Sequence, residues 1–203
     1  MWIVAGALAE WAARVKLFAA SRDEVWRRAR GLPRSAYGTT LAHVGIGLMV
    51  LGIVATTAWQ SERVVTLKVG ERMEIAGYDL AFRGVVPNQG PNYQEQVGLL
   101  AVTRGGSPVT ELAPAKRLYD APRQATTEAG IYAAWTGDLY VVLGDELKDG
   151  SGWVVRAYFN PLVRLIWIGC LIMALGGAFS LSDRRLRIGA PRRARRPLAA
   201  PAE

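Results

Sequence analysis

Two long stretches of this chain contain no charged side chain. Residues 35–61 and 165–182 lack Asp, Glu, Lys and Arg, whereas the sequence between them is ordinary soluble sequence. An apolar run of about 18 or more residues is long enough to cross a hydrocarbon layer about 30 Å thick. We therefore predict two transmembrane helices, at 37–59 and 161–181. Trp59, at the end of the first, is typical of a membrane–water interface.

The positive charge lies beside these runs. The formal net charge is +8, and arginines flank both helices, at Arg22, Arg27, Arg28, Arg30 and Arg34 and at Arg184, Arg185, Arg187, Arg192, Arg193, Arg195 and Arg196. Basic flanks favour the cytoplasmic side. We expect residues 1–34 and the basic tail 182–203 in the cytoplasm and residues 60–160 outside, which in a bacterial inner membrane is the periplasm. Because no base-reading motif accompanies the arginines, we expect no nucleic-acid partner.

The first 34 residues begin with an apolar stretch that is too short to span a membrane. Glu10, Arg14 and Lys16 interrupt it, and the cleavage pattern of a signal peptide is missing. We interpret this segment as the end of a membrane helix, or an amphipathic helix, that runs into a basic stretch. It suggests that the chain is the tail of something longer.

Residues 60–160 change character. Short runs rich in Val, Leu, Tyr and Phe are separated by Gly, Pro, Asn and Asp: RVVTLKV, RMEIAG, YDLAFRGVV, QVGLLAVTR, GDLYVVLGDE and GWVVRAYF. Closely spaced strands with turn residues indicate a small antiparallel barrel or sandwich. Breaks are expected at Pro87-Asn88 and elsewhere, and Arg104-Gly105-Gly106-Ser107 predicts a hairpin turn. The overall fold class is thus a membrane α + β protein.

The single histidine, His43, lies inside the first apolar run. Ionisable residues at this depth are costly and often functional, and imidazole is a common haem ligand. The alternative is a histidine that bonds a neighbouring helix or reaches the interface. One histidine cannot supply two axial ligands, so a haem would need a partner ligand from elsewhere. The sequence shows no P-loop, paired-cysteine metal motif or catalytic triad, and no acidic residue in either span that would favour a transporter.

Other polar and reactive residues have plainer interpretations. Thr126-Thr127-Glu128 can cap a turn or contact a partner, and we favour the turn. Lys116-Arg117-Leu118-Tyr119 is interpreted as a charged strand edge. Cys170, the one cysteine, is expected to be a small apolar helix residue. Trp135 and Trp153 are expected in the core or on the rim of the β domain.

An ordered series of segments carries a family resemblance. These segments are GLPRSAYGTTLAHVGIGLMVLGI, AWQSERVVTLKVGERMEIAGYDLAFRGV, GPNYQ, KRLYDAPRQATTEAGI, GDLYVVLGD and NPLVRLIWIGCLIMALGGAFSLSDRRLR. Together they resemble the C-terminal third of the CcmF-type cytochrome c maturation proteins, the haem lyase subunits of cytochrome c-type biogenesis. The resemblance extends over nearly the whole chain, from about residue 2 to residue 190.

The resemblance implies specific roles. Family members hold a b-type haem between two membrane histidines, one in a Leu-Ala-His-x-Gly motif, so His43 is the implied axial ligand of the haem iron. They attach haem to the CxxCH motif of apocytochrome c with a periplasmic haem chaperone and a thiol-handling, apocytochrome-binding subunit. The family's tryptophan-rich haem-binding segment is missing here, so we expect a split gene product or a truncation that acts with the remaining part of the subunit. The alternative function is a non-enzymatic, membrane-anchored β domain for docking.

Overall fold

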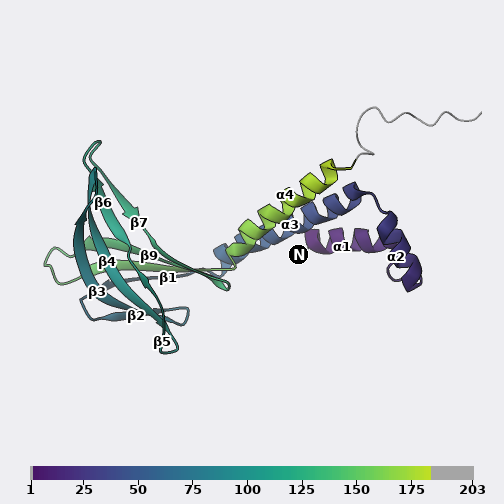
Figure 1. The fold of residues 1–203 in the computed structure, drawn as a ribbon. Coiled ribbons are helices and arrows are strands. Elements are labelled where there is room, and N and C mark those ends of the chain that lie inside the picture. Colours follow the sequence, from purple (N-terminus) through teal and green to yellow (C-terminus); the bar gives the residue numbers. More distant parts are fainter. Residues whose placement is uncertain (1, 184–203) are drawn as a thin grey trace, which may run out of the picture. The chain divides into compact units, whose positions relative to one another are not determined.

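Two structural units make up the computed structural model, which describes residues 2–183 (Figure 1). One unit contains the chain up to Gly47 and the chain from Gly169 onward; the other contains Leu48–Ile168. Of the predicted basic tail, residues 184–203 lie outside the described residues. The helical elements are α1 (Trp2–Val15), α2 (Arg22–Gly31), α3 (Arg34–Ala58) and α4 (Arg164–Leu181).

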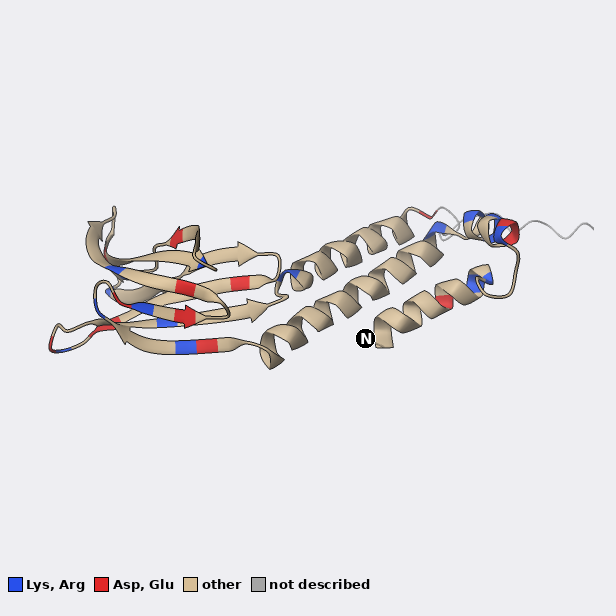
Figure 2. Ribbon diagram, turned by 90° about the horizontal axis from the view of Figure 1, so that it is seen from below, with Lys and Arg blue, Asp and Glu red and all other residues tan. Residues whose placement is uncertain are grey.

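Helices α3 and α4 are each long and apolar enough to cross a membrane. Charged residues occur only at the starts of these two helices (Figure 2). α3 begins directly after Pro33, where a proline is tolerated because the first helical N–H groups have no partner within the helix. α4 begins three residues later than the expected 161, because the last strand continues to Pro161 and Leu162 then adopts a left-handed conformation with φ 56°.

Glycines let α3 and α4 approach closely within the first unit. A Cβ atom at Gly38 would lie 2.6 Å from the carbonyl oxygen of Gly176, and one at Gly45 would lie 2.6 Å from that of Gly169. Gly38 and Gly45 are two helical turns apart and therefore share one face of α3. Small residues at such contacts are typical of helix pairs in membranes, because van der Waals packing drives their association.

The N-terminal helices belong to the same unit. α1 packs against α3 where Gly47 faces Val4, and a Cβ at Gly47 would lie 3.3 Å from the Val4 nitrogen. α2 is polar and carries an ion pair one turn apart between Glu24 and Arg28, at 2.7 Å. The hydrogen bonds from Arg28 lower the pKa of the Glu24 carboxyl below its usual range.

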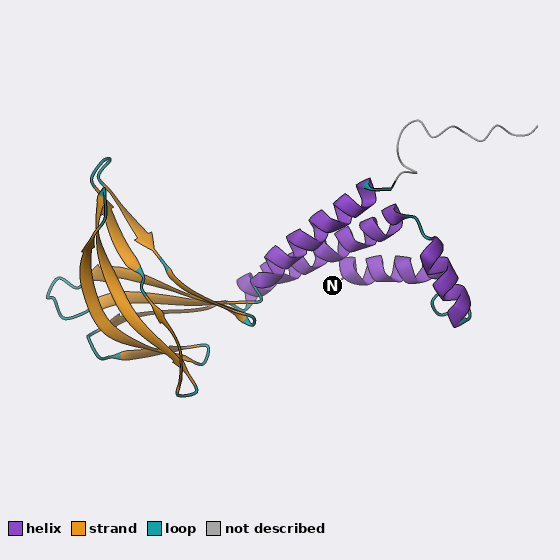
Figure 3. Ribbon diagram, in the orientation of Figure 1, coloured by secondary structure: helices purple, strands orange, loops and turns teal. Residues whose placement is uncertain are grey.

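The β domain is a sandwich of two antiparallel sheets (Figure 3). One sheet has the order β1-β10-β9-β8, and the other has the order β2-β3-β4-β6-β7 with β5 paired to β4. The strands are β1 (Ser61–Leu67), β2 (Arg72–Ile75), β3 (Tyr78–Gln89), β4 (Tyr93–Arg104), β5 (Ser107–Leu112), β6 (Ala115–Tyr119), β7 (Gln124–Glu128), β8 (Gly130–Ala134), β9 (Gly137–Glu146) and β10 (Trp153–Pro161).

Alternate side chains of the two sheets meet in one apolar core. In β9, for example, Leu139, Val141 and Leu143 are buried while the residues between them are partly exposed. They pack with Tyr78, Leu80 and Phe82 of β3, Leu100 and Val102 of β4, and Val155 and Ala157 of β10. Period-two alternation of this kind is the expected sequence signature of a half-buried strand. The predicted barrel or sandwich is therefore confirmed as a sandwich.

The predicted hairpin and the predicted strand break have different outcomes. β4 and β5 are joined by Gly105 and Gly106, both with positive φ, so the hairpin at Arg104–Ser107 is confirmed. The break at Pro87-Asn88 is wrong, because β3 continues through Pro87, which pairs with Gln96 of β4. At this point β2 has ended and β3 has no second neighbour. A proline, which cannot donate a backbone hydrogen bond, is tolerated on such an open side.

Two further interpretations are corrected. Thr126-Thr127-Glu128 does not form a turn but lies in β7, where it pairs with β6. Lys116–Tyr119 is not a strand edge, because β6 is hydrogen-bonded to β4 on one side and β7 on the other. Both segments consist mostly of polar residues although each lies within a sheet, so their composition resembles that of turns and edges.

The close contact of α3 with α4 gives the first testable prediction. In Gly176→Ala, the new Cβ would lie 2.6 Å from the Ala42 nitrogen, so the helices must separate. Overpacking of this kind costs about 1–3 kcal/mol. Gly177→Ala is the matched control, because nothing lies within 4 Å of a Cβ there. Thermal unfolding in detergent, followed by circular dichroism, should show a lower midpoint for G176A alone. Equal midpoints for the two variants would contradict this packing.

Candidate functional site

His43 lies on α3 with its ring exposed. Its Nδ1 atom is 2.8 Å from the carbonyl oxygen of Thr39, one turn earlier. A carbonyl oxygen can only accept a hydrogen bond, so Nδ1 carries the proton in this arrangement. In a neutral imidazole, Nε2 is then the atom with the free lone pair. No described residue hydrogen-bonds Nε2, so this atom is available as a ligand.

The face of α3 that bears His43 is turned away from α4. At about 100° per residue, His43 lies roughly 140° around the helix from Gly38. Its exposed neighbours on this face include Val50 and Val54, which are 39% and 50% exposed. An apolar face that carries one ligand-competent nitrogen is suited to pack against a further helix or a flat apolar group.

Among the residues present, one histidine is suited to an axial position of a haem. His43 is about 14 Å along α3 from its first residue, at 1.5 Å per residue, so its ring lies inside the apolar segment. The sequence contains no other histidine, and residues 2–183 contain no cluster of His, Cys, Asp or Glu that could hold a metal ion. A second histidine ligand is therefore not supplied by this chain.

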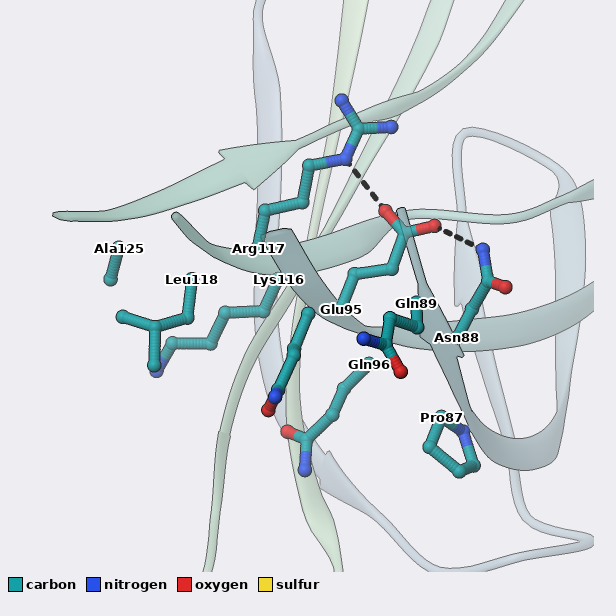
Figure 4. Close-up of a pocket in the computed structure, with 10 residues that line it drawn as sticks. Pro87, Asn88, Gln89, Glu95, Gln96, Lys116, Arg117, Leu118 and Ala125 are labelled. Atoms are coloured by element: carbon teal, nitrogen blue, oxygen red, sulfur yellow. Dashed lines mark hydrogen bonds and ion pairs between the residues drawn. The ribbon is translucent and has the colours of Figure 1, made fainter. Parts of the chain in front are cut away.

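A second polar feature occurs on the β domain, in a groove formed by β3, β4, β6 and β7. Figure 4 shows the Glu95 carboxylate between the side chains of Arg117 and Asn88. Arg117 Nε donates to Glu95 at 2.6 Å, and Asn88 Nδ2 donates to it at 2.7 Å. Arg117 also lies 3.2 Å from Glu128 and 4.6 Å from the ring centroid of Tyr93. These contacts hold four strand segments at fixed separations.

Both carboxylate oxygens of Glu95 accept a hydrogen bond, one from Arg117 and one from Asn88. Glu95 is only 8% exposed. The hydrogen bonds from Arg117 and then Asn88 lower the pKa of the Glu95 carboxyl, and burial opposes that lowering. The same pairing raises the pKa of the Arg117 guanidinium. Both groups therefore stay charged across the physiological range, and the network is structural rather than acid–base.

The groove beside this network has room for a ligand. Its volume is about 730 Å³, and its walls carry the amides of Gln89, Gln94 and Gln96 and the side chains of Lys116 and Leu118. Lys116 is paired with Asp145 of β9. Such a mixture of amide, charged and apolar groups is suited to an extended peptide, whose backbone offers both donors and acceptors.

Sequence reasoning singled out His43, whose ligand role stays a prediction, and it missed Glu95 and Asn88. The sequence did contain one signal. In a strand that begins near Tyr93, Glu95 and Val97 point to one face, whereas Gln94 and Gln96 point to the other. An acidic residue on an inward face requires a cationic or hydrogen-bonding partner. The pairing with Arg117 depends on the β4–β6 register, in which the two residues lie opposite each other.

Comparisons with known proteins agree on one family. The CcmF C-terminal β-sandwich matches residues 58–161. The cytochrome c-type biogenesis protein CycK of Rhizobium meliloti is 49% identical over 199 residues, which cover 98% of this chain and 29% of that protein. The CcmF proteins of Pseudomonas aeruginosa and Escherichia coli are 42% and 38% identical over 84% and 92% of this chain.

A solved structure shares the fold. The structure titled "Cytochrome c Heme Lyase CcmF" superposes with a TM-score of 0.62 at 21% identity, over 89% of this chain and 34% of that one. The chain thus spans about 29% of the CycK protein it resembles and 27% of the E. coli protein.

The Glu95 network predicts an acid-dependent stability. A carboxylate whose folded pKa is lowered stabilises the fold fully above its unfolded pKa of about 4.3, and this stabilisation is lost as pH falls through the folded value. Glu95→Gln should therefore lower the urea midpoint at pH 7, and the difference from the unaltered chain should shrink towards pH 3. Glu111→Gln is the matched control, because its ion pair with Arg83 is exposed on both sides. A difference for E95Q that is independent of pH would contradict the argument.

Proposed function

The chain belongs to the CcmF family of cytochrome c-type biogenesis proteins, and from this premise we propose that it forms part of a cytochrome c haem lyase. In this proposal the assembled lyase attaches haem covalently to the CxxCH motif of apocytochrome c, forming thioether bonds. The observation that carries the proposal for this chain is the state of His43. Its Nδ1 proton is held by the Thr39 carbonyl, and its Nε2 atom is left available.

In the proposed lyase, His43 is one axial ligand of a b-type haem in the membrane. A bound haem of this kind supplies electron transfer, and its potential depends on ligand type and burial. A hydrogen bond from the second ring nitrogen fixes the orientation of a ligating imidazole and raises its basicity. The Thr39 carbonyl supplies that bond here. The remaining part of the lyase subunit contributes the opposite ligand in this proposal.

The proposed location is a bacterial inner membrane. α3 and α4 are apolar enough to span it, and the arginines of the N-terminal segment and of the tail favour the cytoplasm for both flanks. The intervening β domain then lies in the periplasm. The domain limits proposed for this arrangement are 1–34 and 182–203 in the cytoplasm, 37–59 and 161–181 in the membrane, and 60–160 in the periplasm.

A second candidate function is docking by the β domain without a part in haem binding. The groove beside Glu95, with a volume of about 730 Å³, favours it. The proposed partners are apocytochrome c, a periplasmic haem chaperone and a thiol-handling, apocytochrome-binding subunit. The two functions are compatible, but only the first requires haem to depend on His43.

Haem binding tests the first function. The chain should be coexpressed with the rest of the subunit, taken from a relative if necessary, and purified in detergent. We expect a b-type absorption spectrum, and we expect His43→Ala to abolish it because the iron loses an axial ligand. The absorption spectrum of the reduced protein and the haem-to-protein ratio are the measurements.

Thr40→Ala is the matched control, because among the described residues the Thr40 hydroxyl bonds to the Ala36 carbonyl of its own helix, at 3.0 Å. This variant should retain the spectrum. If H43A also retains it, His43 is not a ligand, and the docking function becomes the better account of the chain.

A further inference from the structure

The hairpin between β8 and β9 ends in an exposed tryptophan. β8 ends at Ala134 and β9 begins at Gly137, so Trp135 and Thr136 form the tip. Trp135 is 78% exposed. The expectation that this residue lies in the core or on the rim of the β domain gave it no role. A large aromatic side chain at the tip of a short hairpin contributes little to the core and is available for another contact.

The tip is tied to the start of α4 by several bonds. Arg164, the first residue of α4, donates from Nη2 to the Ala133 carbonyl at 2.7 Å. Its guanidinium lies 5.0 Å from the ring centroid of Trp135. The backbone N–H of Leu162 donates to the Thr136 carbonyl at 3.1 Å. The position of Trp135 is therefore fixed relative to the residue at which the second apolar helix begins.

Arg164 is itself held in place by the hairpin. Its Nε atom lies 4.0 Å from the carboxylate of Asp138. Burial raises the pKa of the Asp138 carboxyl, and the positive charge of Arg164 opposes that rise. Gly137 allows β9 to approach β10, because a Cβ there would lie 2.6 Å from the Asn160 carbonyl oxygen. The hairpin tip and the helix start are thus joined by two hydrogen bonds and an ion pair.

The strand register places a second tryptophan at the same level. Gly137 pairs with Pro161, and Ser61 pairs with Phe159. Continuing this register beyond Ser61 brings Trp59 level with Pro161, at the end of α3. Trp59 is 61% exposed, and Trp167, one turn into α4, is 69% exposed. Trp59, Trp135 and Trp167 are thus three exposed tryptophans close to the points where α3 leads into β1 and β10 leads into α4.

We propose that the Trp135 hairpin tip is a membrane anchor that inserts into the headgroup layer of the bilayer beside α4. The inference rests on the proposed membrane-spanning role of α3 and α4. Tryptophan favours this layer because its ring is apolar and its indole N–H can bond to water or lipid. Arg164 acts as a positioning residue that holds the ring at that depth. The occupant of this surface is therefore lipid.

Tryptophan quenching by brominated lipid tests the anchor. The full chain is reconstituted into phosphatidylcholine vesicles whose acyl chains are brominated close to the headgroups. Trp135→Phe should remove part of the emission that these lipids quench. Trp153→Phe is the matched control, because Trp153 packs against the β core, and its loss should remove unquenched emission only.

A third variant shows whether a negative result refutes only the Trp135 anchor or also the proposal that α4 spans the membrane. Leu175 is 63% exposed and lies about 16 Å along α4 from Arg164, so L175W should add emission that is quenched by lipid brominated near the chain ends. If it does, and W135F leaves the shallow quenching unchanged, the anchor is refuted and the proposed function stands. If the added tryptophan is not quenched, the membrane-spanning proposal fails together with the anchor.

Discussion

The close approach of α3 to α4 is the contact on which the orientation of the candidate ligand depends. Glycines on both helices remove the side chains that would hold the backbones apart, so that Gly38 meets Gly176 and Gly45 meets Gly169. α4 covers that face of α3 and α1 packs nearby at Gly47, but the His43 side chain, roughly opposite α4, remains exposed. A larger residue in the glycine contact would rotate or separate the helices and would move the imidazole with them. The packing of α3 against α4 therefore also determines where the His43 ring points.

The pairing of β1 with β10 has a comparable role in the β domain. β1 follows α3 directly and β10 leads into α4, and the two strands pair along their whole length from Ser61 to Leu67. The residues that leave α3 and enter α4 are thereby held side by side, with Gln60 bonded to Asn160 at 2.6 Å. The Trp135 hairpin lies at the same end of this sheet, because Gly137 of β9 pairs with Pro161 of β10. A sandwich inserted between two helices can keep their adjoining ends together only if its first and last strands are neighbours.

The sequence predicted the parts of this structure that depend on hydropathy and missed those that depend on pairing. The apolar runs located α3 and α4, and the alternating segments located β1–β4, β9 and β10. β5, β7 and β8 were not recognised as strands, and β6 was interpreted as a strand edge, because the polar residues of β6 and β7 obscure the alternation that marks a half-buried strand. Glu95 was missed because its partner Arg117 is brought opposite by register, which local patterns do not encode. His43 could be proposed as a ligand from the sequence because it is a single imidazole in an uncharged segment, and that role stays a prediction.

The helix itself sets the state of that imidazole. Threonine hydroxyls along α3 bond to carbonyls one turn earlier, as in the bond from Thr40 to Ala36, so their polarity is satisfied without neighbours. His43 makes the same kind of bond, from its Nδ1 atom to the Thr39 carbonyl. An imidazole has two nitrogens, however, and one helix can satisfy only the first in this way. In an apolar layer the second is left with an unused lone pair at a fixed direction, which is costly unless an acceptor of that pair is supplied. In the role proposed for His43, its ring is thus oriented by its own helix before any metal or further helix arrives, and the cost of the unsatisfied nitrogen favours the binding of one.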